Sequence, residues 1–280
     1  MNRSLASRHT ASWIGGTVTA LCALIGAAIL ILILGYVAIA GARAINPAFL
    51  TQLPVPVGEP GGGVANGIVG TLITVAIATL LALPIGLLCA LFLALFGRGW
   101  LPEAVRFLSD VLSGIPSIAI GLFAYTLLVA PFRHFSALSA SVAFAILMLP
   151  IILRTSEEAI RSVPRSIREG ALALGLSEFA TTMRIVVPAA RPAITTGLLL
   201  AIARVTGETA PLLFTAFGSQ FWELNPAQPM AQLPLQVFTY AISPYESWHA
   251  QAWAGALLLI AAVFILNVLA RLVLTPRTER

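Results

Sequence analysis

Long apolar segments separated by short polar ones form the main pattern of this sequence. A helix that crosses a lipid bilayer needs about 20 predominantly apolar residues. Six segments meet that requirement in whole or in large part: 14–40, 67–96, 111–130, 137–153, 192–217 and 250–270. The first is longer than the apolar region of a secretory signal, which spans about 7 to 15 residues. The pattern therefore predicts an all-α integral membrane protein with six transmembrane helices.

Two segments between these helices are too long to be simple turns. Residues 42–66 are rich in proline and glycine, so we expect an irregular external loop there. Residues 218–249 mix prolines with aromatic side chains, which prefer the interface between membrane and water. We therefore expect a short helix at 230–241 that lies along the membrane surface.

The composition supports the membrane assignment. Hydrophobic residues make up 59% of the chain and charged residues 10%, whereas soluble proteins carry about 25% charged residues. The same balance excludes a disordered chain, because disorder needs low hydrophobicity and high charge. All 16 basic residues are arginine, so the chain has no lysine for a nucleotide-binding P-loop. If ATP drives this protein, another polypeptide must bind it.

The arginines also predict the orientation. If the N-terminus lies in the cytoplasm, Arg43 and Arg133 are external, Arg204 lies within the membrane, and every other arginine is cytoplasmic. Because arginine is enriched in cytoplasmic loops, we expect both termini inside the cell. Topology then accounts for the net charge of +5, and no nucleic-acid binding is predicted. The three histidines are scattered over a terminus and external loops, so neither catalysis nor a metal site is expected.

The cytoplasmic segment 154–191 carries the signals of several short helices. Thr155 with Glu158, and Ser166 with Glu169, each match the capping box that opens a helix. Two helix starts are therefore predicted close together on the cytoplasmic side.

The second of these helices is expected to end at Gly175, and another to begin near Ser177 and to end before Pro188 and Pro192. Two helices joined by a glycine turn would form a compact projection that fits a groove on a partner protein. The alternative is a solvated loop whose arginines only fix the topology.

The fifth predicted helix contains two charges, Arg204 and Glu208. Arg204 lies about twelve residues into that helix, or roughly 18 Å, and therefore near the bilayer midplane. A charge at that depth costs about 2.5 kcal/mol or more, so an ionisable residue there indicates a function. The two residues are spaced i, i+4 and would share one helix face.

Two interpretations of this pair are open. Arg204 can face a polar substrate pathway and offer its planar guanidinium to an oxyanion. Glu208 would then hold Arg204 in place between passages, or accept a hydrogen bond from a protonated oxyanion. Alternatively, the two charges neutralise each other or pair with a neighbouring helix, and serve packing alone.

Gly207 and Pro211 follow the arginine in the same predicted helix. Gly207 would let another helix approach closely. Pro211 cannot donate a hydrogen bond to the carbonyl of Gly207, so it would bend the helix one turn beyond the charges. This proline is weak evidence for gating, because other predicted membrane helices also contain prolines, namely Pro84, Pro116 and Pro150.

The cytoplasmic segment also contains a spaced motif. It reads Glu169-Gly170-Ala171, then three residues, Gly175, then nine residues, Ile185, Val187 and Pro188. This spacing resembles the EAA loop of ABC importer permeases, with Gly170 in place of the first alanine and Val187 in place of the usual leucine. The resemblance implies coupling helices that dock into separate ATPase subunits, which would bind ATP and Mg while this chain binds no cofactor. The coupling residues would be Glu169, Gly170, Ala171, Gly175, Ile185 and Pro188.

A second resemblance is more specific. Residues 207–216 (GETAPLLFTA), 113–125 (SGIPSIAIGLFAY) and 233–253 are similar to the phosphate permeases of bacterial type I ABC importers. The similarity covers roughly residues 66–270 and implies the MetI-like permease fold there. On this basis the chain divides into a cytoplasmic N-terminus, first helix and external loop, a permease domain, and a cytoplasmic tail. Their ranges are 1–65, 66–270 and 271–280.

The resemblance also implies a function and an assembly. The chain would be the non-catalytic permease subunit of an ATP-driven importer that moves inorganic phosphate inward by alternating access across the bacterial plasma membrane. Its partners would be a homologous permease, two ATPase subunits, an external phosphate-binding protein and membrane lipid. The alternatives are a permease for phosphonate, molybdate or sulfate, a passive channel, or a subunit that mainly signals phosphate status.

Overall fold

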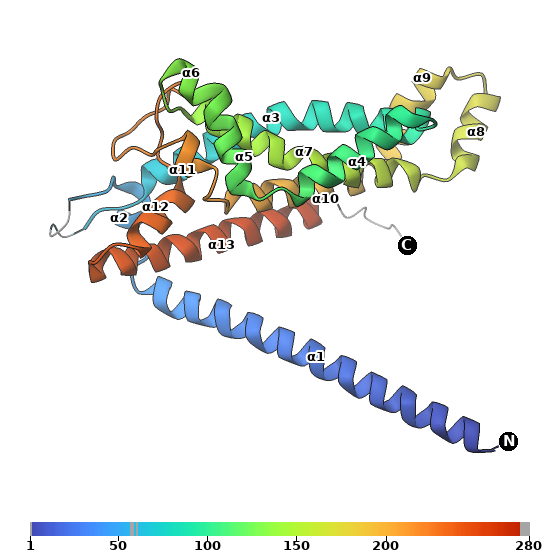
Figure 1. Cartoon of the computed structure of the whole chain (residues 1–280), viewed down its shortest axis with the longest axis horizontal. Coiled ribbons are helices and arrows are strands. Elements are labelled where there is room, and N and C mark those ends of the chain that lie inside the picture. The colour runs from blue at the N-terminus through green and yellow to red at the C-terminus, as the bar shows by residue number, and fades with distance from the viewer. Residues whose placement is uncertain (1, 57–58, 60, 275–280) are drawn as a thin grey trace.

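The computed structural model describes the backbone of residues 2–56, 59 and 61–274 (Figure 1). The regular structure of these residues is helical, apart from one isolated β-bridge between Phe217 and Met230. The long helices are α1 (Asn2–Ala42), α3 (Ala65–Phe96), α7 (Ala137–Arg161), α10 (Val187–Thr206) and α13 (Glu246–Leu274). The predicted tail contributes residues 271–274 to α13. The rest of it, residues 275–280, lies outside the described residues.

Shorter helices connect the long ones. They are α2 (Pro47–Thr51), α4 (Trp100–Gly114), α5 (Ser117–Ala124), η1 (Tyr125–Val129, a π-helix), α6 (Ala130–Phe132), α8 (Arg165–Ala173), α9 (Glu178–Thr181), η2 (Thr182–Val186, also a π-helix), α11 (Leu212–Thr215) and α12 (Leu233–Ala241). The helices α8 and α9 lie at one end of the bundle, while α2, α6 and α12 lie at the other (Figure 1).

Five helical segments in the described part of the chain are long and apolar enough to cross a membrane: Ser12–Ala42, Ala65–Phe96, Ala137–Arg161, Glu178–Thr206 and Glu246–Val268. Each overlaps one of the predicted spans. The third predicted span, 111–130, is wrong as a single straight helix. The chain there forms two apolar pieces, 100–114 and 117–132, bent by 103°. Counted as one broken span, the pair brings the total to six.

The break lies at Ile115 and Pro116. Ile115 has φ −71° and ψ 131°, and Pro116 has φ −56° and ψ 134°, so both are extended. Proline disfavours the helical conformation of the residue before it and lacks an N–H donor, which is why α4 ends at Gly114. In contrast, Pro84 and Pro150 do lie inside α3 and α7.

The helix α7 is central, and it packs against α3 on one side and α10 on another. Small side chains permit this close packing, as is usual between membrane helices. A Cβ atom on Gly86 of α3 would lie 2.8 Å from Cγ2 of Ile152, and one on Gly197 of α10 would lie 2.0 Å from Oγ1 of Thr155. Glycine is therefore required at both contacts.

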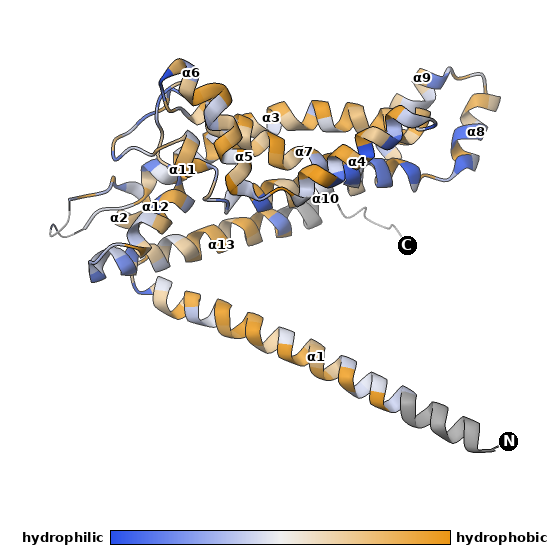
Figure 2. Cartoon of the chain, in the orientation of Figure 1, coloured by the Kyte–Doolittle hydropathy of each residue, from blue (hydrophilic) through white to orange (hydrophobic). Residues whose placement is uncertain are grey.

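The helix α1 diverges from the bundle (Figure 1). Only its carboxyl end packs against α13, where the rings of Tyr36 and Trp253 lie 5.0 Å apart and Gly41 approaches the backbone of Trp253. The preceding residues, 12–34, are all exposed in the single chain. Figure 2 shows that apolar residues cover most of this part of α1, whereas hydrophilic residues gather around α8 and α9.

At the end of the bundle opposite α8 and α9, hydrogen bonds of side-chain amides hold α12 against α3. Gln232 donates from Nε2 to Oγ1 of Thr74 at 2.7 Å, and Gln236 donates to Oδ1 of Asn66 at 3.0 Å. The predicted helix at 230–241 is confirmed as α12, which starts at Leu233. Burial raises the pKa of Tyr240 in this helix to about 12, so its phenol stays neutral at physiological pH.

Candidate substrate route and coupling loop

The first predicted helix start in the segment 154–191 is wrong. The helix α7 continues through Thr155 to Arg161, and the Thr155 hydroxyl donates to the carbonyl of Ile151 at 2.7 Å. The hydroxyl is therefore satisfied inside the helix and caps nothing. The second start is displaced by two residues, because the N-cap of α8 is Pro164, which offers no side-chain acceptor, and not Ser166.

The predicted glycine turn is confirmed. Gly175 has φ +87°, the left-handed region that glycine adopts without strain. The N–H of Gly175 donates to the carbonyl of Leu172 at 2.9 Å, and that of Leu176 donates to the carbonyl of Ala171 at 3.3 Å. These two bonds form a Schellman motif, which satisfies the free carbonyls at the end of α8. Ser177 then caps α9 by accepting from the N–H of Ala180.

The predicted helix end before Pro188 is wrong. The segment 178–206 is one continuous helical rod, made of α9, η2 and α10. The π-helical turn η2, which contains Ile185, precedes the proline, and the N–H of Val187 bonds to the carbonyl of Thr182. Pro188 therefore lies inside the rod, directly after the π-helical turn, and such a local adjustment lets a membrane helix tolerate a proline. The third predicted cytoplasmic helix and the fifth predicted membrane helix are therefore the same element.

The loop made of α8, Gly175 and α9 projects from the end of the bundle (Figure 1). Glu169 and Gly170 are exposed and Ala171 is buried. Two large apolar side chains near the tip are also exposed, Leu174 at 86% and Phe179 at 74%. Large apolar side chains exposed this strongly on a charged projection fit a protein-binding surface. We call residues 165–181 the coupling loop.

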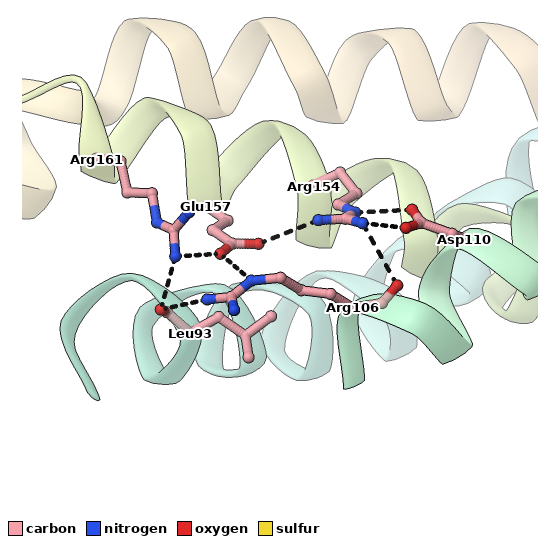
Figure 3. A network of polar contacts seen from close by, with 6 residues as sticks. All are labelled: Leu93, Arg106, Asp110, Arg154, Glu157 and Arg161. Atoms are coloured by element: carbon pink, nitrogen blue, oxygen red, sulfur yellow. Dashed lines mark hydrogen bonds and ion pairs between the residues drawn. The ribbon is translucent and has the colours of Figure 1, made fainter. Parts of the chain in front are cut away.

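Next to the coupling loop, an ion-pair network joins α4 to α7 (Figure 3). The carboxylate of Glu157, whose side chain is 4% exposed, accepts from Nε of Arg106 at 2.8 Å and lies 3.0 Å from Nη2 of Arg161. Its second oxygen lies 3.7 Å from Nη1 of Arg154. Arg154 also forms a two-pronged ion pair with Asp110. A buried carboxylate with three cations around it is fully compensated.

The same network caps the end of α3. The carbonyl of Leu93, in the last turn of α3, accepts from Arg106 at 3.0 Å and from Arg161 at 3.4 Å. Cationic side chains at a helix carboxyl end satisfy free carbonyls and oppose the helix dipole. Three helices are thus tied together at one point. From the sequence, Arg106, Arg154 and Arg161 were interpreted only as topology signals. The spacing of Arg154 and Arg161 from Glu157, three and four residues, was a usable sign of pairing, whereas Arg106 reaches Glu157 from α4.

The helix that carries Arg204 differs from its prediction. It ends at Thr206, so Glu208 lies beyond the helix in an irregular segment and does not share a helix face with Arg204. No ion pair or side-chain hydrogen bond of either residue occurs within the described part of the chain. The proposed mutual neutralisation of the two charges is therefore wrong for this conformation. The helical segment that carries Arg204 also begins earlier than expected, at Glu178 and not near Pro192.

Arg204 lies on the outward face of α10. Leu200 and Thr196, one and two turns earlier, are exposed on the same side, while Ala201 and Val205 are fully buried on the face toward α7. The described residues therefore provide nothing to cover Arg204. Because a guanidinium in contact with lipid tails is costly, this face of α10 must meet a polar space or another protein.

After Thr206 the backbone is irregular until Pro211, which begins the short helix α11. Pro211 does not bend a continuous helix as predicted, because the chain has already left the helix at Gly207. The prediction for Gly207 is also wrong within this chain, since a Cβ there would meet nothing within 4 Å. The close approach occurs elsewhere: a Cβ on Gly121 of α5 would lie 2.6 Å from Cα of Pro211.

Comparison with known proteins shows which protein family the chain belongs to. Residues 82–279 match the family described as "binding-protein-dependent transport system inner membrane component". The chain belongs to this family. Every candidate residue named above, from Leu93 to Pro211, lies within the matched part. Members of this family are inner membrane components of transport systems, and five described helices of this chain are long and apolar enough to cross a membrane. The chain is therefore a multi-pass transport component.

Individual members of the permease family extend the comparison. A "phosphate transport system permease protein PstA" of Yersinia pestis is 42% identical over 85% of this chain and 81% of its own length. Proteins with the same description from Haemophilus influenzae and Xylella fastidiosa are 42% and 44% identical over 83% and 76% of this chain.

The fold is shared with a solved ABC transporter. A membrane chain of the MetNI methionine ABC transporter in an inward-facing conformation aligns with a TM-score of 0.63 over 75% of this chain and 94% of its own. A second crystal form gives a TM-score of 0.56. Sequence identity is 17% and 16%, so the likeness concerns the fold. The permease is therefore an all-α, MetI-like membrane subunit.

Proposed function

We propose that this permease carries inorganic phosphate into the cell as the membrane subunit of an ATP-driven importer. The observation that carries the proposal is the similarity to phosphate transport permeases, at 42% identity over 85% of the chain. The exposed arginine at the interrupted end of α10 supplies the matching chemistry. Phosphate is an oxyanion, and a planar guanidinium binds oxyanions through two parallel hydrogen bonds.

The interruption after Thr206 supports a pathway at this point. Irregular backbone at membrane depth is tolerated where it is buried in protein or lines a water-filled space. Transporters also place substrate sites where membrane helices are discontinuous. Arg204, on the uncovered face of α10, would contact the anion. Glu208, beyond the end of that helix, would accept a hydrogen bond from hydrogenphosphate, while Gly207 and Pro211 define the interruption.

The assembly follows from the same family resemblance. We propose a PstC-like second permease against the uncovered face of α10, two PstB-like ATPase subunits and a PstS-like external phosphate-binding protein. The coupling loop would dock one ATPase through Leu174 and Phe179, which are exposed in the single chain. ATP and Mg would be bound and used on the ATPase, so this chain would be non-catalytic.

The proposed orientation places the coupling loop and both termini in the cytoplasm, with the chain in a bacterial inner membrane. A cysteine introduced at Ser166 tests it, because that residue is exposed on α8. The native cysteines, Cys22 and Cys89, are first replaced by serine so that they give no signal. A membrane-impermeant maleimide should label Ser166→Cys only when added from the cytoplasmic side. Labelling from outside intact cells would reverse the orientation.

Reconstitution tests the substrate. The complete transporter in liposomes, with ATP on the side of the ATPase, should take up labelled phosphate far faster than sulfate or molybdate. Faster uptake of another oxyanion would reassign the substrate within the same class. Uptake without ATP would indicate a passive channel and would contradict the proposal.

A further inference from the structure

A cavity of about 680 Å³ lies between the coupling loop and the end of α3. Its size falls in the usual range of ligand sites, about 300–1,000 Å³. The walls come from the end of α3, the turn that follows it, the end of α7, and the coupling loop with the adjoining η2. Two stretches of the chain that are far apart in the sequence, 93–98 and 160–186, therefore form its walls, and an occupant would contact both.

The charged lining of the cavity is mainly basic. Four arginines line it, against two glutamates. The arginines are Arg98, Arg161, Arg165 and Arg168, and the glutamates are Glu169 and Glu178. The lining therefore carries an excess of two positive charges.

The internal pairs account for part of this charge. Arg168 forms an ion pair with Glu178, with an N–O distance of 2.6 Å, and Arg161 pairs with the buried Glu157 of the network in Figure 3. In contrast, no ion pair or side-chain hydrogen bond of Arg98 or Arg165 occurs within the described residues. Arg98 follows α3 and Arg165 begins α8, so the two come from different segments of the lining. Glu169 of α8 also lines the cavity and forms no ion pair within the described residues, so the unpaired charges of the lining leave a net excess of one positive charge.

We propose that this cavity binds a phosphate group, held between Arg98 and Arg165. Guanidinium groups match phosphate geometry, and basic pockets at the cytoplasmic ends of membrane helices suit lipid headgroups. The apolar part of the lining, such as Leu95 and Val163, would accommodate the first atoms of an acyl chain. Two sources share this chemistry: the headgroup of an anionic phospholipid, and free inorganic phosphate from the cytoplasm.

Occupancy would tie the coupling loop to the end of α3. The loop position would then depend on the anion, either as a lipid requirement or as feedback from phosphate inside the cell. This consequence for transport rests on the proposed function. The binding itself does not, because the cavity is separate from Arg204, which lies more than two helical turns beyond the η2 residue Val186 that lines it.

Binding is measured on the complete transporter in lipid nanodiscs. In the first arm, the discs contain only phosphatidylcholine, and radiolabelled inorganic phosphate is added in equilibrium dialysis. In the second arm, discs contain phosphatidylglycerol with phosphatidylcholine, and lipid retained by the purified complex is quantified by mass spectrometry. Each arm compares the wild type with the double variant Arg98→Gln/Arg165→Gln.

Matched variants separate this site from others. Arg191→Gln removes an exposed arginine on α10 that does not line the cavity, and Arg204→Ala removes the proposed substrate contact. We expect the double variant to lose about ten-fold or more in affinity in one arm, and Arg191→Gln to match the wild type. Loss in the first arm identifies free phosphate as the ligand, and loss in the second identifies the lipid.

Three results would overturn the proposal. The first is an unchanged affinity of the double variant in both arms. The second is an equal loss in Arg191→Gln, which would indicate only general attraction to positive charge. The third is phosphate binding that disappears in Arg204→Ala but persists in the double variant. That last result would support the proposed substrate route while removing the cavity site, so the two ideas fail independently.

Discussion

The arginines around Glu157 and the arginine at the end of α10 show two opposite uses of the same residue. Arg106, Arg154 and Arg161 all have carboxylate partners supplied by this chain. Arg204 has no such partner among the described residues, which leave its face of α10 uncovered. The first group compensates a buried carboxylate and joins helices of the same chain. Arg204, in a predicted membrane helix, needs a polar partner beyond the described residues.

The largest effect is expected for Arg204→Ala. The complex should assemble normally, because Arg204 makes no ion pair within the described chain. Phosphate uptake in liposomes should fall by at least about ten-fold, since a charge-assisted contact to the anion is lost. Arg204→Lys keeps the charge but not the planar pair of donors, and should recover only part of the uptake. Full uptake by the alanine variant would show that Arg204 is not needed for phosphate uptake. It would also remove the contrast with the arginines around Glu157.

Glu157→Gln tests the other side of the comparison. It leaves three guanidinium groups around a neutral amide and should destabilise the permease by about 3 kcal/mol or more. The measurement is the thermal unfolding midpoint of the purified complex. Glu158→Gln is the matched control, because Glu158 is the exposed neighbour and forms no ion pair within the described residues. An equal, small shift in both variants would show that the network is not structural.

Gly121→Ala tests the contact between α5 and α11, next to the interruption that follows α10. The added Cβ would lie 2.6 Å from the backbone of Pro211, so either α5 or α11 must move. We expect a destabilisation of about 1–3 kcal/mol and a lower rate of transport. Gly114→Ala provides the comparison, since a Cβ there meets nothing within 4 Å. If both variants transport equally well, the contact between α5 and α11 does not shape the route.

Gly175→Ala should have the smallest effect on stability. A left-handed φ of +87° costs a residue with a side chain about 1–2 kcal/mol. Gly170→Ala, within α8 and without strain, should be neutral. The stronger substitution, Gly175→Arg, should also reduce the amount of ATPase that co-purifies with the permease. Co-purification and transport-stimulated ATP hydrolysis at wild-type levels would show that the turn is not part of the docking surface.

The hydrophobic pattern predicted the membrane helices better than it predicted their interruptions. Five spans and the turn at Gly175 follow from local signals, namely apolar length and a glycine beyond a helix end. Pro116 and Pro150 both lie in predicted spans, yet only Pro116 breaks its helix. Its neighbours Ser113, Gly114 and Ser117 favour a turn, whereas apolar residues flank Pro150. Whether a proline-containing segment stays in one helix also depends on long-range packing, which a single sequence does not display.

One part of the candidate site is visible in the sequence and another is not. Arg204 stands out because a lone charge in an apolar segment is visible in the sequence. Its relation to Glu208 is not visible, because the i, i+4 spacing applies only if the helix continues, and it ends at Thr206. The contact of Glu157 with Arg106 was not visible in the sequence, because Arg106 lies on α4, a helix that the apolar pattern did not predict.

The continuity of the segment 178–206 has a mechanical consequence. Its 29 residues form a lever about 43 Å long, with the coupling loop at one end and Arg204 at the other. A tilt of about 10° around the loop end would shift the arginine sideways by roughly 7 Å, more than the width of a phosphate ion. A movement that an ATPase imposes on the coupling loop could thus make or break the contact between Arg204 and an anion. The helical segment between them would need no hinge.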